Sequence, residues 1–216
     1  MLFAQSTIVS ITGSIKNELT KEPIGIDIRL FNTEGKQIGI SRSNSKDGYY
    51  FITGLKPDSV YYLKFMDFSY FSDSHEFQVP NTKKYAEYSK DFVVKPKQIG
   101  LKFPLRVIPF DLGKSKLRPG ADIFLKDLLN SMKLNRRVDF KIAAFPDNDG
   151  DRQFNQQITT ERCEALKKYF IQNGIEETRI TIQSNPTTDP DNPPPAKKQA
   201  KGKRYLGSIY LEITKI

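Results

Sequence analysis

The chain has 216 residues and a formal net charge of +9, with 38% hydrophobic and 27% charged residues. This length is enough for two ordinary domains or one large one, and the composition indicates a globular chain. No apolar run approaches the ~20 residues that a membrane-spanning helix needs.

The positive charge favours an acidic or phosphate-bearing partner, or it serves solubility alone. The basic residues are spread over most of the chain, which does not favour nucleic-acid binding. They cluster once, at Lys197, Lys198, Lys201, Lys203 and Arg204. Cys163 is the only cysteine, so no internal disulfide can form, and its position predicts a small buried hydrophobe. With His75 as the only histidine, a zinc site is not expected.

Residues 1–6 resemble the end of a signal peptide, with an apolar stretch and a small residue before a polar start. They are too short to be a whole one. We therefore expect a residual leader tail on a protein exported to the periplasm.

Residues 7–95 show strand patterns throughout. Apolar side chains alternate at Ile24, Ile26, Ile28 and Leu30, and again at Tyr61, Leu63 and Phe65. This period of two indicates half-buried strands. Turn residues follow at 33–35, 46–48 and 56–58, and Asp47-Gly48 between apolar runs predicts a hairpin. Short strands with regular turns predict an all-β sandwich.

This half resembles the carboxypeptidase regulatory-like (transthyretin-like) sandwich. The matching segments are residues 11–15, 22–24, 47–51, 54–57 and 61–63. The resemblance implies a non-catalytic spacer or docking module.

The segment from Tyr61 to Phe77 is rich in aromatic residues. We interpret most of them as filling the sandwich core. Exposed rings between Phe68 and Phe71 are the alternative, as a protein-docking patch.

Residues 96–100 read as a linker, and the pattern then changes. We expect strands at 105–110, 138–144, 179–183 and 209–214, with helices at 119–135 and about 156–173. Ile123, Leu125, Leu128, Leu129 and Met132 would form the apolar side of the first helix. Gly174 would end the second helix. The alternation predicts an α+β domain over residues 101–216, with its helices on one face of the sheet.

This half contains an acidic residue and an arginine whose spacing suggests a ligand-binding site. Asp147 and Arg162 lie fifteen residues apart, with Asn155 and Thr159 between them. Held a fixed distance apart, such a pair can bind a zwitterion, because the carboxylate accepts hydrogen bonds from an ammonium and the guanidinium donates two hydrogen bonds to a carboxylate. The alternative is an ordinary loop and helix cap with a surface ion pair, which contributes little.

Residues 101–216 resemble the OmpA-like C-terminal domain, whose family binds peptidoglycan through the diaminopimelate centre of its stem peptides. The resemblance is carried by residues 110–119, 147–165, 169–171, 173–175 and 179–180. It implies that Asp147 holds the ligand's ammonium and Arg162 its carboxylate.

Four further roles follow from the same resemblance. Asn155 would fix the loop and donate to the ligand, and Gly113 would offer backbone contacts. Thr159 would cap the start of the helix. Arg204 is a candidate third contact. An anion shared with the helix start would explain why a cation lies there.

The chain also departs from the family pattern. Ala144-Phe145-Pro146 replaces the usual Gly-His-Thr before the key acid, and Pro146 lacks a backbone donor. Residues 185–203 form a Pro-, Asp- and Lys-rich insert that we expect to be a mobile loop. Residues 147–151 resemble a calcium loop, but their Gly is fourth rather than sixth and the twelfth position is Ile158 instead of Glu, so calcium is not expected.

These observations favour a periplasmic, outer-membrane-associated, non-enzymatic protein. Its second domain would bind the peptidoglycan stem peptide, and its sandwich would dock an outer-membrane protein or complex. The alternative is a protein-docking scaffold with a vestigial wall site. An enzyme acting on the wall lacks support, because no nucleophile and base are paired. No cofactor is expected.

Overall fold

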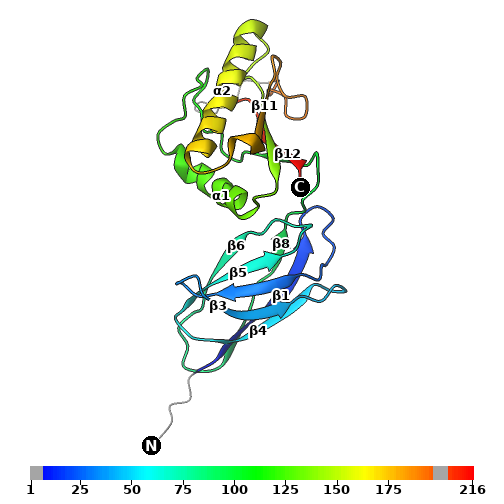
Figure 1. Ribbon diagram of the computed structural model, residues 1–216, viewed down its shortest axis with the longest axis vertical. Coiled ribbons are helices and arrows are strands. Elements are labelled where there is room, and N and C mark those ends of the chain that lie inside the picture. The colour runs from blue at the N-terminus through cyan, green and yellow to red at the C-terminus, as the bar shows by residue number, and fades with distance from the viewer. Residues whose placement is uncertain (1–6, 197–203) are drawn as a thin grey trace, which may run out of the picture. The chain divides into compact units, whose positions relative to one another are not determined.

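The computed structural model describes residues 7–196 and 204–216, and the chain divides into two compact units, unit 1 at residues 1–97 and unit 2 at residues 98–216 (Figure 1). The expected leader tail at residues 1–6 lies outside the described residues, as does most of the basic cluster. Among the described helices, none combines the length and apolar character required to cross a membrane.

Unit 1 consists of two four-stranded sheets. Its strands are β1 (Val9–Asn17), β2 (Asp27–Phe31), β3 (Gln37–Arg42), β4 (Tyr49–Leu55), β5 (Val60–Met66), β6 (Ser74–Gln78), β7 (Ala86–Ser89) and β8 (Phe92–Val94). One sheet has the order β4-β1-β7, with β8 also pairing with β1, and the other has the order β3-β2-β5-β6. The first strand, β1, pairs antiparallel with β4 and parallel with both β7 and β8.

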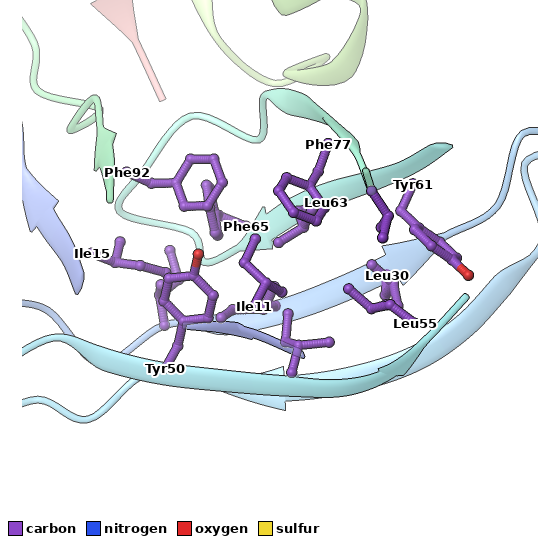
Figure 2. Close-up of a cluster of buried hydrophobic side chains, with 14 of the residues drawn as sticks. Ile11, Ile15, Leu30, Tyr50, Leu55, Tyr61, Leu63, Phe65, Phe77 and Phe92 are labelled. Atoms are coloured by element: carbon purple, nitrogen blue, oxygen red, sulfur yellow. The ribbon is translucent and has the colours of Figure 1, made fainter. Parts of the chain in front are cut away.

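Apolar side chains from both sheets meet in one core, shown in Figure 2. Ile11 and Ile15 come from β1, while Leu30 and Leu63 are cross-strand partners on β2 and β5. The alternation of buried and half-buried positions on β5 produces this arrangement, as a sandwich requires.

Most of the aromatic segment fills this core. Tyr61, Phe65, Phe71 and Phe77 are buried, whereas Phe68 is 86% exposed. The core interpretation therefore holds for these four rings, and Phe68 is the exposed aromatic of the proposed docking loop.

The turns of unit 1 lie where the sequence predicts them. The turns at 46–48 and 56–58 do not make hairpins, because each connects strands of different sheets. β2 and β3 pair antiparallel across the turn at Gly35, whose φ is 76°. By contrast, β3 and β4 belong to different sheets, so the predicted Asp47-Gly48 hairpin is wrong. Gly48 adopts a φ of 74° and a Cβ there would lie 2.4 Å from the Ile15 carbonyl oxygen, so the turn passes the chain between sheets against β1.

Unit 2 has one sheet and two α-helices. Its elements are β9 (Lys102–Pro104), α1 (Ala121–Leu134), β10 (Asp139–Ala144), α2 (Arg152–Gln172), a 3-10 turn η1 (Glu177–Arg179), β11 (Ile180–Ser184) and β12 (Ile209–Lys215). The strand order is β11-β10-β12-β9, with β10 and β11 parallel and the other pairs antiparallel. The buried side chains of β10, β11 and β12 include Phe140, Ile142, Ile180 and Leu211, and α2 packs on β10 and β11 (Figure 1).

Two expectations for unit 2 are wrong. The strand predicted at 105–110 is instead the short β9, because after Pro104 only the Leu105 amide still donates to β12, at Ile209. Ile123 is 70% exposed, since Leu125, Leu129 and Met132 supply the buried side of α1.

α2 begins four residues before the predicted start. Asp151 caps it by accepting hydrogen bonds from the backbone amides of Gln153 and Phe154. Gly174 follows the helix with a φ of 92°, as expected of a residue that ends a helix.

Candidate functional site

Asp147 and Arg162 meet in a buried ion pair. The Nη1 of Arg162 donates to Oδ1 of Asp147 at 2.9 Å, and its Nη2 donates to Oδ2 at 2.8 Å. The side chains are 0% and 5% exposed, respectively. Two parallel charge-assisted hydrogen bonds fix the distance and the plane of the pair.

The Asp147 carboxylate is saturated by donors. Besides the guanidinium, the backbone amide of Gly113 donates to Oδ2 at 2.9 Å and that of Gly207 donates to Oδ1 at 2.8 Å. Four donors thus occupy the roughly four acceptor positions of a carboxylate. Burial raises the pKa of Asp147, but the hydrogen bonds from Arg162, Gly113 and Gly207 outweigh it and hold the pKa below its usual value.

Arg162 also binds the loop that precedes α1. Its Nε donates to the Lys114 carbonyl at 2.9 Å, and Nη2 donates to the Asp111 carbonyl at 3.3 Å. Its guanidinium lies 5.5 Å from the centre of the buried Phe110 ring. The pair therefore ties together three segments, at residues 110–114, 147 and 207.

This geometry corrects one expectation. We expected the two charges to be held apart so that a ligand could bind between them, but they are in direct contact and the guanidinium is closed off from solvent. A ligand cannot enter between them without exchanging partners with both groups.

Thr159 does not cap the helix. It lies about two turns inside α2, and its hydroxyl donates to backbone carbonyls including Asn155 at 2.8 Å and Asn185 at 3.0 Å. Arg162 lies almost three turns inside, beyond the reach of the helix-terminal charge, so no cation at the helix start needs an explanation.

Asn155 fixes the loop, as expected. Its side-chain amide donates to the carbonyls of Asn148 at 2.7 Å and Pro186 at 3.2 Å. Both N–H groups are thus committed inside the protein, which leaves neither for the expected donation to a ligand.

Gly207 is a member of the site that the sequence reading missed. A Cβ at this position would lie 2.0 Å from the Phe145 carbonyl oxygen, so only glycine lets the chain approach Asp147 this closely. Sequence offers no direct signal for it, because Gly207 lies sixty residues from its partner. Arg204 is exposed, and no ion pair joins it to another residue that the structure describes.

The structure shows where the residues that depart from the family pattern lie. The Phe145 ring packs edge-on against Tyr210, with centroids 6.0 Å apart. The first part of the insert at residues 185–203 is held by hydrogen bonds. The backbone amide and hydroxyl of Thr188 donate to the Asp149 carboxylate, and the Tyr210 hydroxyl donates to the buried Asp189 at 2.5 Å. The expected mobile loop therefore does not extend over residues 185–192.

Sequence comparison assigns the domain. Residues 109–204 match the OmpA family. Outer membrane protein P5 of Haemophilus influenzae is 24% identical over 132 residues, covering 59% of this chain and 36% of that protein. Outer membrane porin F of Pseudomonas fluorescens is 26% identical over 86 residues, covering 38% of this chain and 26% of that protein.

Unit 2 therefore contains an OmpA-family domain, at residues 109–204. The chain spans only about a third of the length of the curated relatives it matches. Among solved structures, the shaft pilin SpaA from Lactobacillus rhamnosus GG aligns with a TM-score of 0.34 and 18% identity over 44% of this chain and 50% of that chain. That score is too low to carry an argument about fold or function.

Proposed function

We propose that unit 2 binds peptidoglycan non-covalently, through the diaminopimelate centre of the stem peptide. The observation that carries this proposal is the OmpA-family match together with the buried Asp147–Arg162 pair inside it. The free centre of diaminopimelate carries an ammonium and a carboxylate, so its recognition requires groups of both charges within the space of one amino acid. The resemblance assigns those groups to Asp147 and Arg162.

The closed pair shapes how this function can work. Direct binding would place the ligand's ammonium on Asp147 and its carboxylate on Arg162, so that each ionic hydrogen bond lost is replaced by one of the same kind. Alternatively, the pair holds residues 111–114 and 207 in place for a ligand bound beside it. In both cases loss of either charge weakens binding.

We further propose that the chain is a non-enzymatic anchor in the cell envelope. Envelope association is supported by the outer-membrane relatives, and unit 1 would act as the docking module for an outer-membrane protein or complex. The resemblance of unit 1 to carboxypeptidase regulatory-like modules supports a docking role. Burial raises the pKa of the Cys163 thiol to about 12, so this cysteine is not a nucleophile at neutral pH.

Binding to isolated peptidoglycan tests the proposal. Purified wild-type protein should co-sediment with sacculi that contain diaminopimelate and should bind a soluble stem peptide. Asp147→Ala and Arg162→Ala should each weaken binding by about 2–5 kcal/mol, as expected when one member of a shielded charge pair is removed.

Asp139→Ala is a matched control, because its pair with Lys215 is 3.9 Å long and the Lys215 side chain is 71% exposed. Circular dichroism must show that each variant is folded at the assay temperature. Absence of binding by the wild type, or binding at the wild-type level by both site variants, would rule out the proposal.

A scaffold with a vestigial wall site is the second candidate. The saturated carboxylate of Asp147 favours it, as do the exposed apolar side chains of β3 and β4 in unit 1, where Ile40 is 71% and Tyr49 50% exposed. A folded wild-type protein that ignores sacculi, while unit 1 alone still binds the envelope partner, would establish this function instead.

A further inference from the structure

The outer face of the sheet β3-β2-β5-β6 in unit 1 carries two cations side by side at its centre. Arg29 on β2 and Lys64 on β5 are direct cross-strand partners. Both point away from the core, because the next residues inward, Leu30 and Leu63, fill it (Figure 2). Like charges directly opposite each other on paired strands are destabilising. The fold itself therefore gives no reason for placing two cations here.

No carboxylate of the described chain pairs with either cation. The ion pair on this face joins Arg42 to Asp27 at 2.5 Å, and both side chains are at least half exposed. Glu76 on β6 lies two positions from the strand partner of Lys64, but no ion pair joins the two. Lys64 instead lies over the Phe31 ring, with its Nζ 4.5 Å from the ring centre. The two positive charges therefore remain available to an anion from outside.

Apolar side chains flank the two cations. Ile40, the partner of Arg29 on the edge strand β3, is 71% exposed, and Ile38 on the same strand is 46% exposed. On β5 the half-buried Tyr62 and Met66 lie on the same side of the sheet as the lysine between them. Contiguous exposed apolar side chains of this kind mark interaction sites, whereas single ones do not.

The charge pattern indicates which partner fits this face. A carboxylate placed between Arg29 and Lys64 would replace their repulsion with two charge-assisted hydrogen bonds. Apolar side chains beside that carboxylate would cover Ile40 and Tyr62. An anionic lipid surface also carries negative charge, but basic segments that bind one use clusters of about four to eight Lys or Arg residues. This face has two unpaired cations, so its chemistry favours an acidic protein segment.

We propose that this face is where unit 1 docks its partner in the envelope, and that the partner presents carboxylates flanked by apolar side chains. The inference rests on the docking role proposed for unit 1, and it names the surface and the chemistry of the partner. It does not depend on peptidoglycan binding by unit 2.

A photo-crosslinker at position 40 tests the proposal. The full-length Ile40→Cys protein is labelled with benzophenone maleimide and irradiated with solubilised outer membranes, freed of peptidoglycan, from the cells that produce it. Mass spectrometry then identifies the cross-linked peptide. Cys163 is buried and does not compete for the label. Ile123→Cys is the matched control, because Ile123 is 70% exposed and belongs to unit 2.

Charge reversal identifies the contact. Arg29→Glu combined with Lys64→Glu should lower cross-linking from position 40 about tenfold, because two attractive contacts become repulsive. Lys83→Glu combined with Lys84→Glu makes the same change in net charge at two exposed residues outside this sheet, and should leave cross-linking at the starting level. Replacing the acids of the cross-linked partner by lysine should restore cross-linking to the reversed face. Circular dichroism must show that both charge-reversed proteins are folded.

The remaining outcomes separate this inference from the docking role itself. A partner peptide without acidic residues, or cross-linking that charge reversal leaves unchanged, would overturn the inference. Binding to vesicles of phosphatidylethanolamine and phosphatidylglycerol that is lost on the same reversal would assign the face to the membrane instead. If position 40 gives no product above the Ile123→Cys control while the protein still binds the solubilised membranes, the face is wrong and docking stands. If the protein binds nothing in those membranes, the docking role fails as well.

Discussion

Unit 2 buries two arginines and stabilises their charges in different ways. Arg162 pairs with a carboxylate, whereas Arg179 donates to the backbone carbonyls of Met132, Asn135 and Val138 at 2.7–3.2 Å. Met132 lies in the last turn of α1 and Asn135 directly follows it, so a cation is favoured there by the helix dipole as well. The comparison teaches that Arg179 closes a helix end, while Arg162 joins loops that only the folded chain brings together.

The largest expected effect is the loss of the Arg162 pair. Asp147→Ala and Arg162→Ala should each lower the free energy of unfolding of unit 2 by about 3–5 kcal/mol, because each leaves a buried charge without its partner. Urea denaturation of unit 2, whose unfolding can be followed by circular dichroism, measures this. The double variant should cost less than the two single losses together, and strict additivity would show that the pair is not coupled.

Arg179→Ala should cost somewhat less, about 3 kcal/mol, since it strips charge-assisted hydrogen bonds from buried carbonyls without leaving an ionised partner behind. The same urea titration applies. Peptidoglycan binding by the folded fraction should stay at the wild-type level, which separates the two arginines by function. A large loss of affinity in this variant would mean that the comparison between them is mistaken.

Gly207→Ala should cost about 2 kcal/mol by disturbing the Arg162 region alone. The new Cβ would meet the Phe145 and Pro146 carbonyl oxygens at 2.0 and 2.5 Å, so the backbone must shift and the amide moves away from Asp147. Thermal unfolding against Gly35→Ala is a suitable measurement, because nothing lies within 4 Å of a Cβ at Gly35 and only its backbone strain is tested there. A nearly neutral Gly207→Ala would show that the close approach is not required.

The smallest expected effect is a difference in acid sensitivity. The folded-state pKa of Asp147 lies below its unfolded value, so its contribution is complete above the unfolded pKa of about 4 and is lost as the pH falls through the folded pKa. Stability measured between pH 7 and pH 2 should therefore fall less steeply in Asp147→Asn than in wild type. Arg179→Ala should keep the wild-type slope, and equal slopes in all three proteins would contradict the role assigned to Asp147.

The sequence singled out Asp147 and Arg162 as members of one site and predicted the elements that carry them, because residue order and helical periodicity are local signals. It did not predict that the pair is closed. That depends on the amides of Gly113 and Gly207, which tertiary folding brings to one carboxylate from opposite directions. Asp47-Gly48 shows the same limit in unit 1. A turn residue specifies that the chain changes direction, but it does not specify which sheet the next strand joins.

The pairing of β1 has a consequence for synthesis. Its parallel neighbours β7 and β8 end at Val94, so the earliest strand made waits for the latest part of its unit. At ~5–20 residues per second, the interval between Asn17 and Val94 takes roughly 4–15 s. Until then, the side of β1 that pairs with β7 and β8 keeps unpaired backbone N–H and C=O groups, which is the kind of strand edge that can pair with another chain.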